Sequence, residues 1–293
     1  MAKRMRLTLS FGRHHSRNDT KDIRQALAKR RYSIFVDECM EMPADQRKAY
    51  ILKANELQTK LNILAKGKKV EVDDTFTDGL IGALVGSGVK YFMVEGHSPE
   101  EIRLMRAAHE KRDVIIPEIF KYAVFSWRVH DAIQKTLDYL DGSAEYLRLR
   151  NNAIVRGFER MPDEIGEFFA QMDGEVHVLG RFGSHHYAIL DVLNDLGMDV
   201  ECDDKESGSF RGISRTLIRM TYPDITYVPS ETEVAEAMFS ILYKGFAEKK
   251  SEASEEMALR CLGGVEGFLR FLDDIAGTRD AGRKFKDACW TNC

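Results

Sequence analysis

The sequence predicts an α/β fold with a mainly parallel sheet flanked by helices, and a mixed sheet stays open as an alternative. Short apolar runs, typical of buried strands, alternate along the chain with longer segments of helical periodicity. This alternation is the pattern of parallel α/β proteins. The 293 residues, of which 44% are hydrophobic and 31% charged, are enough to bury a large core.

The composition excludes several classes of protein. It is too balanced for a collagen-like or disordered chain. No run of about 18 apolar residues occurs, so no membrane span is expected. The apolar stretch at 7–11 is too short and too polar for an export signal. The five cysteines are scattered without a C-x-x-C pair, so we expect five thiols in a cytoplasmic protein.

The first third of the chain alternates strand and helix. Residues 6–11 are predicted to form a short strand, and the apolar runs at 32–36 and 89–94 predict buried strands. Apolar residues recurring every three or four positions predict helices at 19–31 and 43–65. Ser98-Pro-Glu-Glu is a capping box with proline at the first helical position, and it predicts that the next helix starts there.

The rest of the chain begins with a helical region and returns to strands later. An apolar stripe from Ile119 to Leu140 predicts one helix, which Asp141-Gly142-Ser143 should end before a second helix at 144–160. Strands are expected again in the C-terminal half of the chain, at 176–179, 198–202 and 225–228. Helices are expected at 184–196, with Gly197 as its C-cap, and at 253–275.

No linker rich in proline, glycine or serine divides the chain. We therefore expect an α/β core at 1–205 that carries a helical insert at about 98–170. A mostly helical C-terminal extension at 206–293 should pack on the same domain.

Charge is unevenly distributed. The chain has 43 Lys and Arg against 47 Asp and Glu, yet residues 1–31 hold ten basic residues against two acidic ones. Such a basic arm is one footprint of nucleic-acid binding. Aromatic residues for base stacking are sparse within it, so we favour attraction of an anion to a site near the first strand.

Histidines form two pairs, His14-His15 and His185-His186, and each pair follows a glycine in the pattern G-x-x-H. With 22 glycines and 8 histidines, about 0.6 such matches are expected by chance, and three occur. Two of them, Gly12 to His15 and Gly183 to His186, fall where a strand should end and a helix begin. The third, ending at His177, leads into a strand.

A strand-to-helix turn is a favourable place for chemistry. Binding sites of parallel sheets gather at the carboxyl ends of strands, and glycine allows close backbone approach there. The partial positive charge of a helix N-terminus favours neutral imidazole, which is the form that binds metal or acts as a base. Two such turns on neighbouring strands would bring His15 and His186 together, with His14 and His185 as further candidates.

Carboxylates occupy comparable strand ends. Glu38 follows one predicted strand and Glu95 another, and a carboxylate beside a buried strand is costly without a role. A His/His/carboxylate set suits Zn, Mn, Fe or Co and leaves a position for water. The structural alternative is that each histidine–glutamate contact is an ordinary hydrogen bond.

These motifs, in this order, resemble the Tiki/TraB, erythromycin-esterase-like and ChaN-like superfamily over about residues 6–202. Members carry a G-x-x-H after the first strand, a glutamate ending the next strand, a helix with an arginine, and a second late G-x-x-H. The corresponding positions here are Gly12 to His15, Glu38 or Glu95, Arg150, and Gly183 to His186.

What the resemblance implies is varied, because relatives include metal-dependent proteases, esterases and a haem-binding branch. Many relatives read Gly-Glu-x-His, whereas Arg13 stands here in place of that glutamate. This departure puts an esterase mechanism in doubt and favours an anionic substrate.

The leading hypothesis is a metal-dependent hydrolase acting on a small molecule or peptide. His15 and His186 would bind the metal, Glu38 would be a ligand or general base, and Arg150 would hold an oxyanion or acidic group. The alternatives are a non-catalytic module that binds haem or an anion, and a nucleic-acid-associated protein that uses the basic arm. The sequence does not give the substrate, the metal or the oligomeric state.

Overall fold

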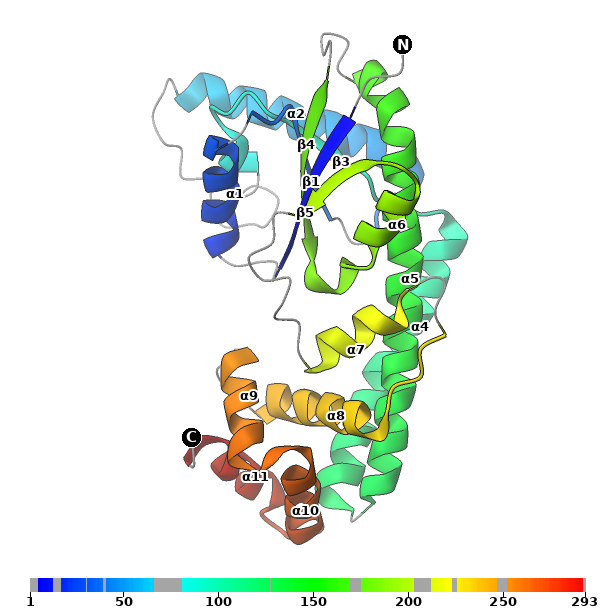
Figure 1. Cartoon of the computed structure of the whole chain (residues 1–293), viewed down its shortest axis with the longest axis vertical. Coiled ribbons are helices and arrows are strands. Elements are labelled where there is room, and N and C mark those ends of the chain that lie inside the picture. The colour runs from blue at the N-terminus through cyan, green and yellow to red at the C-terminus, as the bar shows by residue number, and fades with distance from the viewer. Residues whose placement is uncertain are drawn as a thin grey trace. The chain divides into compact units, whose positions relative to one another are not determined.

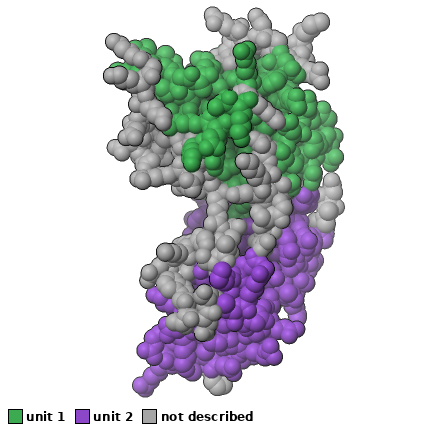
Figure 2. All heavy atoms as spheres, turned by 60° about the vertical axis from the view of Figure 1, so that its left-hand side comes forward, with its two compact units in different colours: residues 1–103, 149–209 green, residues 104–148, 210–293 purple. Residues whose placement is uncertain are grey.

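The computed structural model describes residues 5–12, 17–29, 31–38, 41–65, 81–126, 128–168, 175–202, 212–222, 226–246 and 252–291. These residues form two compact units, coloured separately in Figure 2. Unit 1 comprises residues 1–103 and 149–209, and unit 2 comprises 104–148 and 210–293. The division falls within two helices, α4 (Pro99–Phe120) and α5 (Val129–Phe168), so the predicted insert at 98–170 contributes to both units.

Unit 1 is built on a five-stranded sheet in which every pairing is parallel, and this confirms the predicted fold class. The strand order is β3-β2-β4-β1-β5. The strands are β1 (Met5–Gly12), β2 (Ile34–Asp37), β3 (Lys90–Met93), β4 (Val176–Gly183) and β5 (Asp199–Cys202).

The two faces of the sheet differ around β1, an interior strand between β4 and β5. Leu7, Leu9 and Phe11 are at most 1% exposed and form the apolar face. On this face the ring of Phe158 from α5 packs against Phe182 of β4, with ring centroids 5.9 Å apart. The alternate residues of β1, by contrast, are polar: Arg6, Thr8 and Ser10.

Helices cover both sides of the sheet. In Figure 1, α1 (Arg17–Lys29) lies on one side, and α6 (Ile189–Asp195) lies on the other with the part of α5 that belongs to unit 1. Helix α2 (Ala44–Ala65) completes the edge at β3. There the side-chain amide of Asn55 donates to the carbonyl of Tyr91 at 2.8 Å and accepts its N–H at 3.1 Å. This side chain satisfies backbone groups that an edge strand leaves unpaired.

A glycine sets the distance between α5 and the end of β3. A Cβ added at Gly157 would lie 2.1 Å from the carbonyl oxygen of Val94, so no larger residue fits at this position without displacing the helix. Gly157 lies two turns after Arg150 on the same helix. The close approach therefore brings the arginine near the carboxyl end of the sheet.

Within its described residues, unit 2 contains helices and connecting segments but no strand. It contains most of α4, the π-helical turn η1 (Lys121–Phe125) and the first half of α5, followed by α7 (Gly212–Met220), α8 (Glu231–Phe246), α9 (Glu252–Cys261), α10 (Gly264–Ile275) and α11 (Ala281–Thr291). Its core holds Phe239, Phe268 and Phe285, each at most 1% exposed. Their ring centroids lie 5.1 to 6.3 Å apart.

Several local predictions are wrong. The single helix expected from Ile119 to Leu140 is divided, because α4 ends at Phe120, η1 follows, and α5 begins at Val129. The segment Asp141-Gly142-Ser143 does not end a helix, because α5 runs through it without a break. Residues 226–228, in the expected strand at 225–228, are neither helix nor strand. The expected helix at 253–275 is two helices, because Gly263 and Gly264 take the left-handed conformation with φ of 86° and 75°.

Tertiary packing explains why α5 continues past Gly142. Leu140 and Ala144 are fully buried and Ser143 is 4% exposed, so the segment lies against neighbouring residues on both sides of the glycine. The free-energy cost of glycine inside a helix is only about 1 kcal/mol, which such burial outweighs.

The cysteines are also not all as expected. Cys202 and Cys289 are thiols, but Cys261 is disulfide-bonded, so the prediction of five thiols is wrong at that position.

Across the described ranges, no helix is both long and apolar enough to cross a membrane.

Candidate functional site

Four neighbouring strands end at the candidate site. β1 and β4 are hydrogen-bonded neighbours, and Gly12 pairs with Gly183 in their register. The glycines that open the two G-x-x-H motifs therefore lie side by side. Glu38 directly follows β2, which is the next strand beyond β4, and Glu95 follows β3 at the edge. The carboxyl ends of parallel strands thus gather the predicted residues at one edge of the sheet.

Arg150 lies at the centre of this arrangement. Its Nε and Nη2 donate to the two carboxylate oxygens of Glu95 at 2.7 and 2.8 Å, and its Nη1 donates to Oε1 of Glu38 at 3.0 Å. The arginine is 3% exposed. Because its guanidinium already binds two carboxylates, the structure gives Arg150 the task of holding Glu38 and Glu95 in place.

Glu95 is fully buried and forms an ion pair with Arg150. Burial raises its pKa, but the charge and hydrogen bonds of Arg150 and the hydrogen bond with His97 outweigh burial, and the net pKa lies below the ordinary value. Nε2 of His97 lies 2.8 Å from Oε1 of Glu95. Glu95 is therefore a structural carboxylate that stays ionised at neutral pH.

Glu38 is the more accessible of the two carboxylates, with 13% of its side chain exposed. Its Oε2 accepts the backbone N–H of Gly183 at 2.5 Å. Its Oε1 accepts from Arg150 and lies 3.4 Å from Nε2 of His186. The carboxylate is thus fixed at both oxygens and directed at the histidine of the second G-x-x-H motif.

His186 is held from its other nitrogen. Its Nδ1 lies 2.5 Å from Oδ1 of Asn151, the residue next to Arg150 on α5. With the asparagine oxygen as acceptor, Nδ1 carries the proton and Nε2 presents a lone pair. That lone pair faces a carboxylate oxygen of Glu38. Two acceptors directed at each other are favourable only with a cation between them, either a proton or a metal ion.

The two side chains fit a divalent metal. Ligands at about 2.1 Å from a tetrahedral ion lie about 3.4 Å apart, and Nε2 of His186 and Oε1 of Glu38 are separated by 3.4 Å. The hydrogen bond from Nδ1 to an amide oxygen is the usual support for a metal-binding histidine. Glu38 and His186 supply two metal ligands. The described part of the chain contains no cluster of three or more His, Cys, Asp or Glu side chains suited to a metal.

Several predicted site residues have no described position. Arg13, His14 and His15 lie outside the described residues. His185 is half-buried in the 3-10 turn η2 (Ser184–His186), and none of the contacts above involves it. Of the two candidate glutamates, Glu38 contacts His186 and Glu95 contacts His97.

Sequence reasoning missed His97 and Asn151. Both are buried, at 0% and 7% exposure. Nδ1 of His97 and Nδ2 of Asn151 are buried without a hydrogen-bond partner within the described structure, which is uncommon for polar atoms in folded proteins. The available signals were the Glu95-Gly-His97 spacing and the position of Asn151 next to Arg150.

Comparison with known proteins adds no relationship. No family model, no curated protein and no solved structure matches the chain.

Proposed function

We propose that the protein is a metal-dependent hydrolase of the G-x-x-H type, with its site at the carboxyl ends of β1, β2 and β4. The observation that carries the proposal is the relationship between His186 and Glu38. Nε2 of His186 faces Oε1 of Glu38 at 3.4 Å, while Asn151 binds the other ring nitrogen. This arrangement leaves an imidazole lone pair and a carboxylate directed at one point.

In this proposal Glu38 and His186 hold a divalent ion, and His15 or His14 completes the set. Such an ion would lower the pKa of a bound water and polarise the group that is attacked. As the partly exposed carboxylate of the cluster, Glu38 would serve either as a ligand of this ion or as the general base that takes the proton of the attacking water. Gly183 and Arg150 restrict its movement through their hydrogen bonds.

Arg150 acts as a positioning residue in this site. Its bonds to Glu38 and Glu95 hold the catalytic carboxylate in position. The predicted role of Arg150 in binding an oxyanion therefore passes to Arg13, whose guanidinium follows directly after Gly12 in the first motif. Arg13 lies outside the described residues, so this role is inferred from its place in the motif; its charge would favour a small-molecule or peptide substrate with an acidic group.

The test measures bound metal and hydrolysis together. The full-length protein is stripped with a chelator, reloaded with Zn, Mn, Fe or Co, and assayed for metal by mass spectrometry. Esters, phosphoesters and peptides are then offered as substrates. His186→Ala and Glu38→Gln should reduce both metal content and turnover. His130→Ala is the matched control, because His130 is an exposed histidine of α5 in unit 2.

Three results would count against the proposal. Metal content that is the same in wild type, His186→Ala and His130→Ala would remove His186 from the set of ligands. Absence of bound metal after every loading would exclude the metal mechanism. Metal binding without hydrolysis of any substrate class would contradict the hydrolase and favour a binding module.

The alternatives receive less support from the site. Haem binding needs an accessible histidine in an apolar pocket, whereas His186 is 1% exposed and faces a carboxylate. Within the possible nucleic-acid arm, the side chain of Arg6 is paired with Glu201.

A cytoplasmic location is part of the proposal. Cell fractionation checks it, and the disulfide at Cys261 does not favour a reducing compartment.

A further inference from the structure

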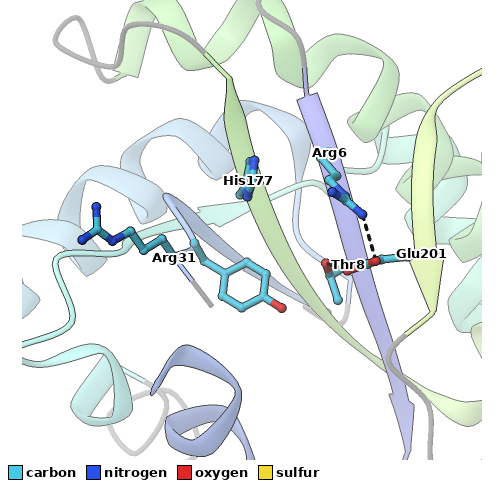
Figure 3. Close-up of a pocket in the computed structure, with 6 residues that line it drawn as sticks. Arg6, Thr8, Arg31, His177 and Glu201 are labelled. Atoms are coloured by element: carbon cyan, nitrogen blue, oxygen red, sulfur yellow. Dashed lines mark hydrogen bonds and ion pairs between the residues drawn. The ribbon is translucent and has the colours of Figure 1, made fainter. Parts of the chain in front are cut away.

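A second polar site lies in unit 1, on the face of the sheet that carries Arg6 and Thr8 of β1. A pocket of about 410 Å³ is lined by Arg6, Thr8, Arg31, Tyr32, His177 and Glu201. Figure 3 shows that Arg6, Thr8 and Glu201 lie together on one side and Arg31 on the other, with its guanidinium directed outward. The volume is in the range of pockets that hold small molecules.

The polar character of this face is unusual for a parallel sheet. Strands of such sheets are normally buried on both faces and apolar throughout. β1 is an interior strand, yet Arg6 and Thr8 are on this face. Arg6 pairs with the polar residues His177 and Asp199 on its two neighbouring strands. Thr8 pairs with Glu201 on one side and with the apolar Leu179 on the other. A row of polar side chains across three adjacent strands needs a polar partner.

Arg6 is held in place with most of its donors unused. Its Nη2 donates to Oε2 of Glu201 at 3.2 Å, and the hydroxyl of Thr8 donates to Oε1 of the same carboxylate at 2.8 Å. Within the described structure Arg6 makes no other polar contact, and its side chain is 45% exposed. A guanidinium carries five N–H groups in a planar fork that suits carboxylates and phosphates.

Tyr32 gives independent evidence for a ligand. It is only 8% exposed and lines the pocket, but no described residue forms a hydrogen bond with its hydroxyl. The hydroxyl is not among the fully enclosed polar atoms, so it is accessible from the pocket and can donate to a ligand there. At the rim, Arg31 likewise has no described ion-pair partner. The pocket therefore offers two arginines against the single carboxylate of Glu201, which leaves a net positive charge.

We propose that this pocket binds a small hydroxylated organic anion through its phosphate or carboxylate group. Arg6 and the hydroxyl of Tyr32 donate to the oxyanion, and Arg31 contributes positive charge at the rim. The ring of His177 carries a further polar atom, Nδ1, for a hydroxyl of the ligand, since its Nε2 is paired with Glu175 at 3.2 Å. The site is separate from the Glu38 cluster. Arg6 lies six residues before Gly12 along β1, or about 20 Å at the rise of a strand.

The experiment is a calorimetric titration of the full-length protein with glycerol 3-phosphate, glycerate and uncharged glycerol. A chelator is present throughout, so that no metal at Glu38 and His186 contributes. We expect saturable binding of at least one anion and none of glycerol. Binding of glycerol 3-phosphate alone assigns a phosphate, and binding of glycerate alone assigns a carboxylate.

Variants locate the binding. Arg6→Gln and Tyr32→Phe should each weaken it, and the loss of the charged donor of Arg6 should weaken it about tenfold or more. The controls are Arg270→Gln, at an exposed arginine of unit 2, and Tyr139→Phe, at a half-buried tyrosine of unit 2. Tyr32→Phe removes one oxygen only, so it tests the site even if Arg6→Gln fails to fold.

Two outcomes would overturn the proposal. One is that neither anion binds, or that glycerol binds equally well. The other is binding that survives unchanged in both Arg6→Gln and Tyr32→Phe. Neither outcome bears on the proposed hydrolase, because the chelated protein is tested and the Glu38 cluster is unaltered.

Discussion

Arg150 binds Glu95 through two parallel hydrogen bonds, at 2.7 and 2.8 Å, and both side chains are at most 3% exposed. Removing one member of a buried pair leaves the other charge without compensation. Arg150→Met should therefore lower the free energy of unfolding by about 3–5 kcal/mol, measured by urea denaturation. Arg103→Gln, at an exposed arginine paired with Glu100, should leave the midpoint nearly unchanged. Equal changes in the free energy of unfolding in the two variants would show that the buried pair contributes no more to stability than the exposed pair.

The same pair predicts how stability depends on pH. The pKa of Glu95 in the folded protein lies below its ordinary value of 4.5, so the unfolded chain takes up the proton first as pH falls. Its contribution to stability is complete above the unfolded pKa and is lost as pH falls through the folded pKa. Urea midpoints measured from about pH 6 to about pH 3 should decline. Glu95→Gln should be less stable at the higher pH and should show a shallower decline.

The contact with Asn151 fixes the orientation of the His186 ring. Loss of a side chain that supports a metal-binding histidine typically costs about 10–100-fold in metal affinity. Asn151→Ala should therefore weaken metal binding by that factor, provided that the proposed site is correct. Competition with a chelator of known affinity measures it. Asn152→Ala, at the exposed next residue of α5, is the control. Identical affinities in the two variants would show that the contact between Asn151 and His186 does not support a metal.

Gly157 and Gly166 form a matched pair on α5. A Cβ at Gly157 would lie 2.1 Å from the carbonyl oxygen of Val94, whereas a Cβ at the exposed Gly166 meets nothing within 4 Å. Gly157→Ala should destabilise the fold by about 1–3 kcal/mol or more, because the helix must move away from the strand. Gly166→Ala should stabilise it by about 0.5–1 kcal/mol. Thermal unfolding of both variants checks the prediction, and stabilisation by both would contradict the close approach.

The thiol of Cys289 should be unreactive in the folded protein. Burial raises its pKa to about 12, so almost no thiolate exists at neutral pH, and thiolate is the reactive form. Iodoacetamide labelling followed by peptide mapping should modify Cys289 slowly in native buffer and rapidly in denaturant. Fast labelling in native buffer would mean that α11 opens easily.

The local sequence was sufficient to predict most of the sheet. Four strands were expected near their observed positions, and two of them, β2 and β3, are compact apolar runs around Val36 and Phe92. Strand β4 was expected too short because its second half, Gly180-Arg-Phe-Gly183, is not an apolar run. Helix ends were less predictable where packing opposed local preference. Gly142 continues a helix because its neighbours are buried, whereas Gly263 and Gly264 separate two helices.

The sequence by itself determined the α/β class and the residue types at the strand ends, because hydrophobic periodicity and glycine turns are local properties of the chain. Only the tertiary structure decided which of those residues meet. The strand order β3-β2-β4-β1-β5 makes Gly12 and Gly183 register partners. It also places Glu38 beside His186 and Glu95 beside Arg150. The spacing between Glu38 and Arg150 along the chain holds no information on this contact. It arises because parallel strands end at a common edge and Gly157 lets α5 approach that edge.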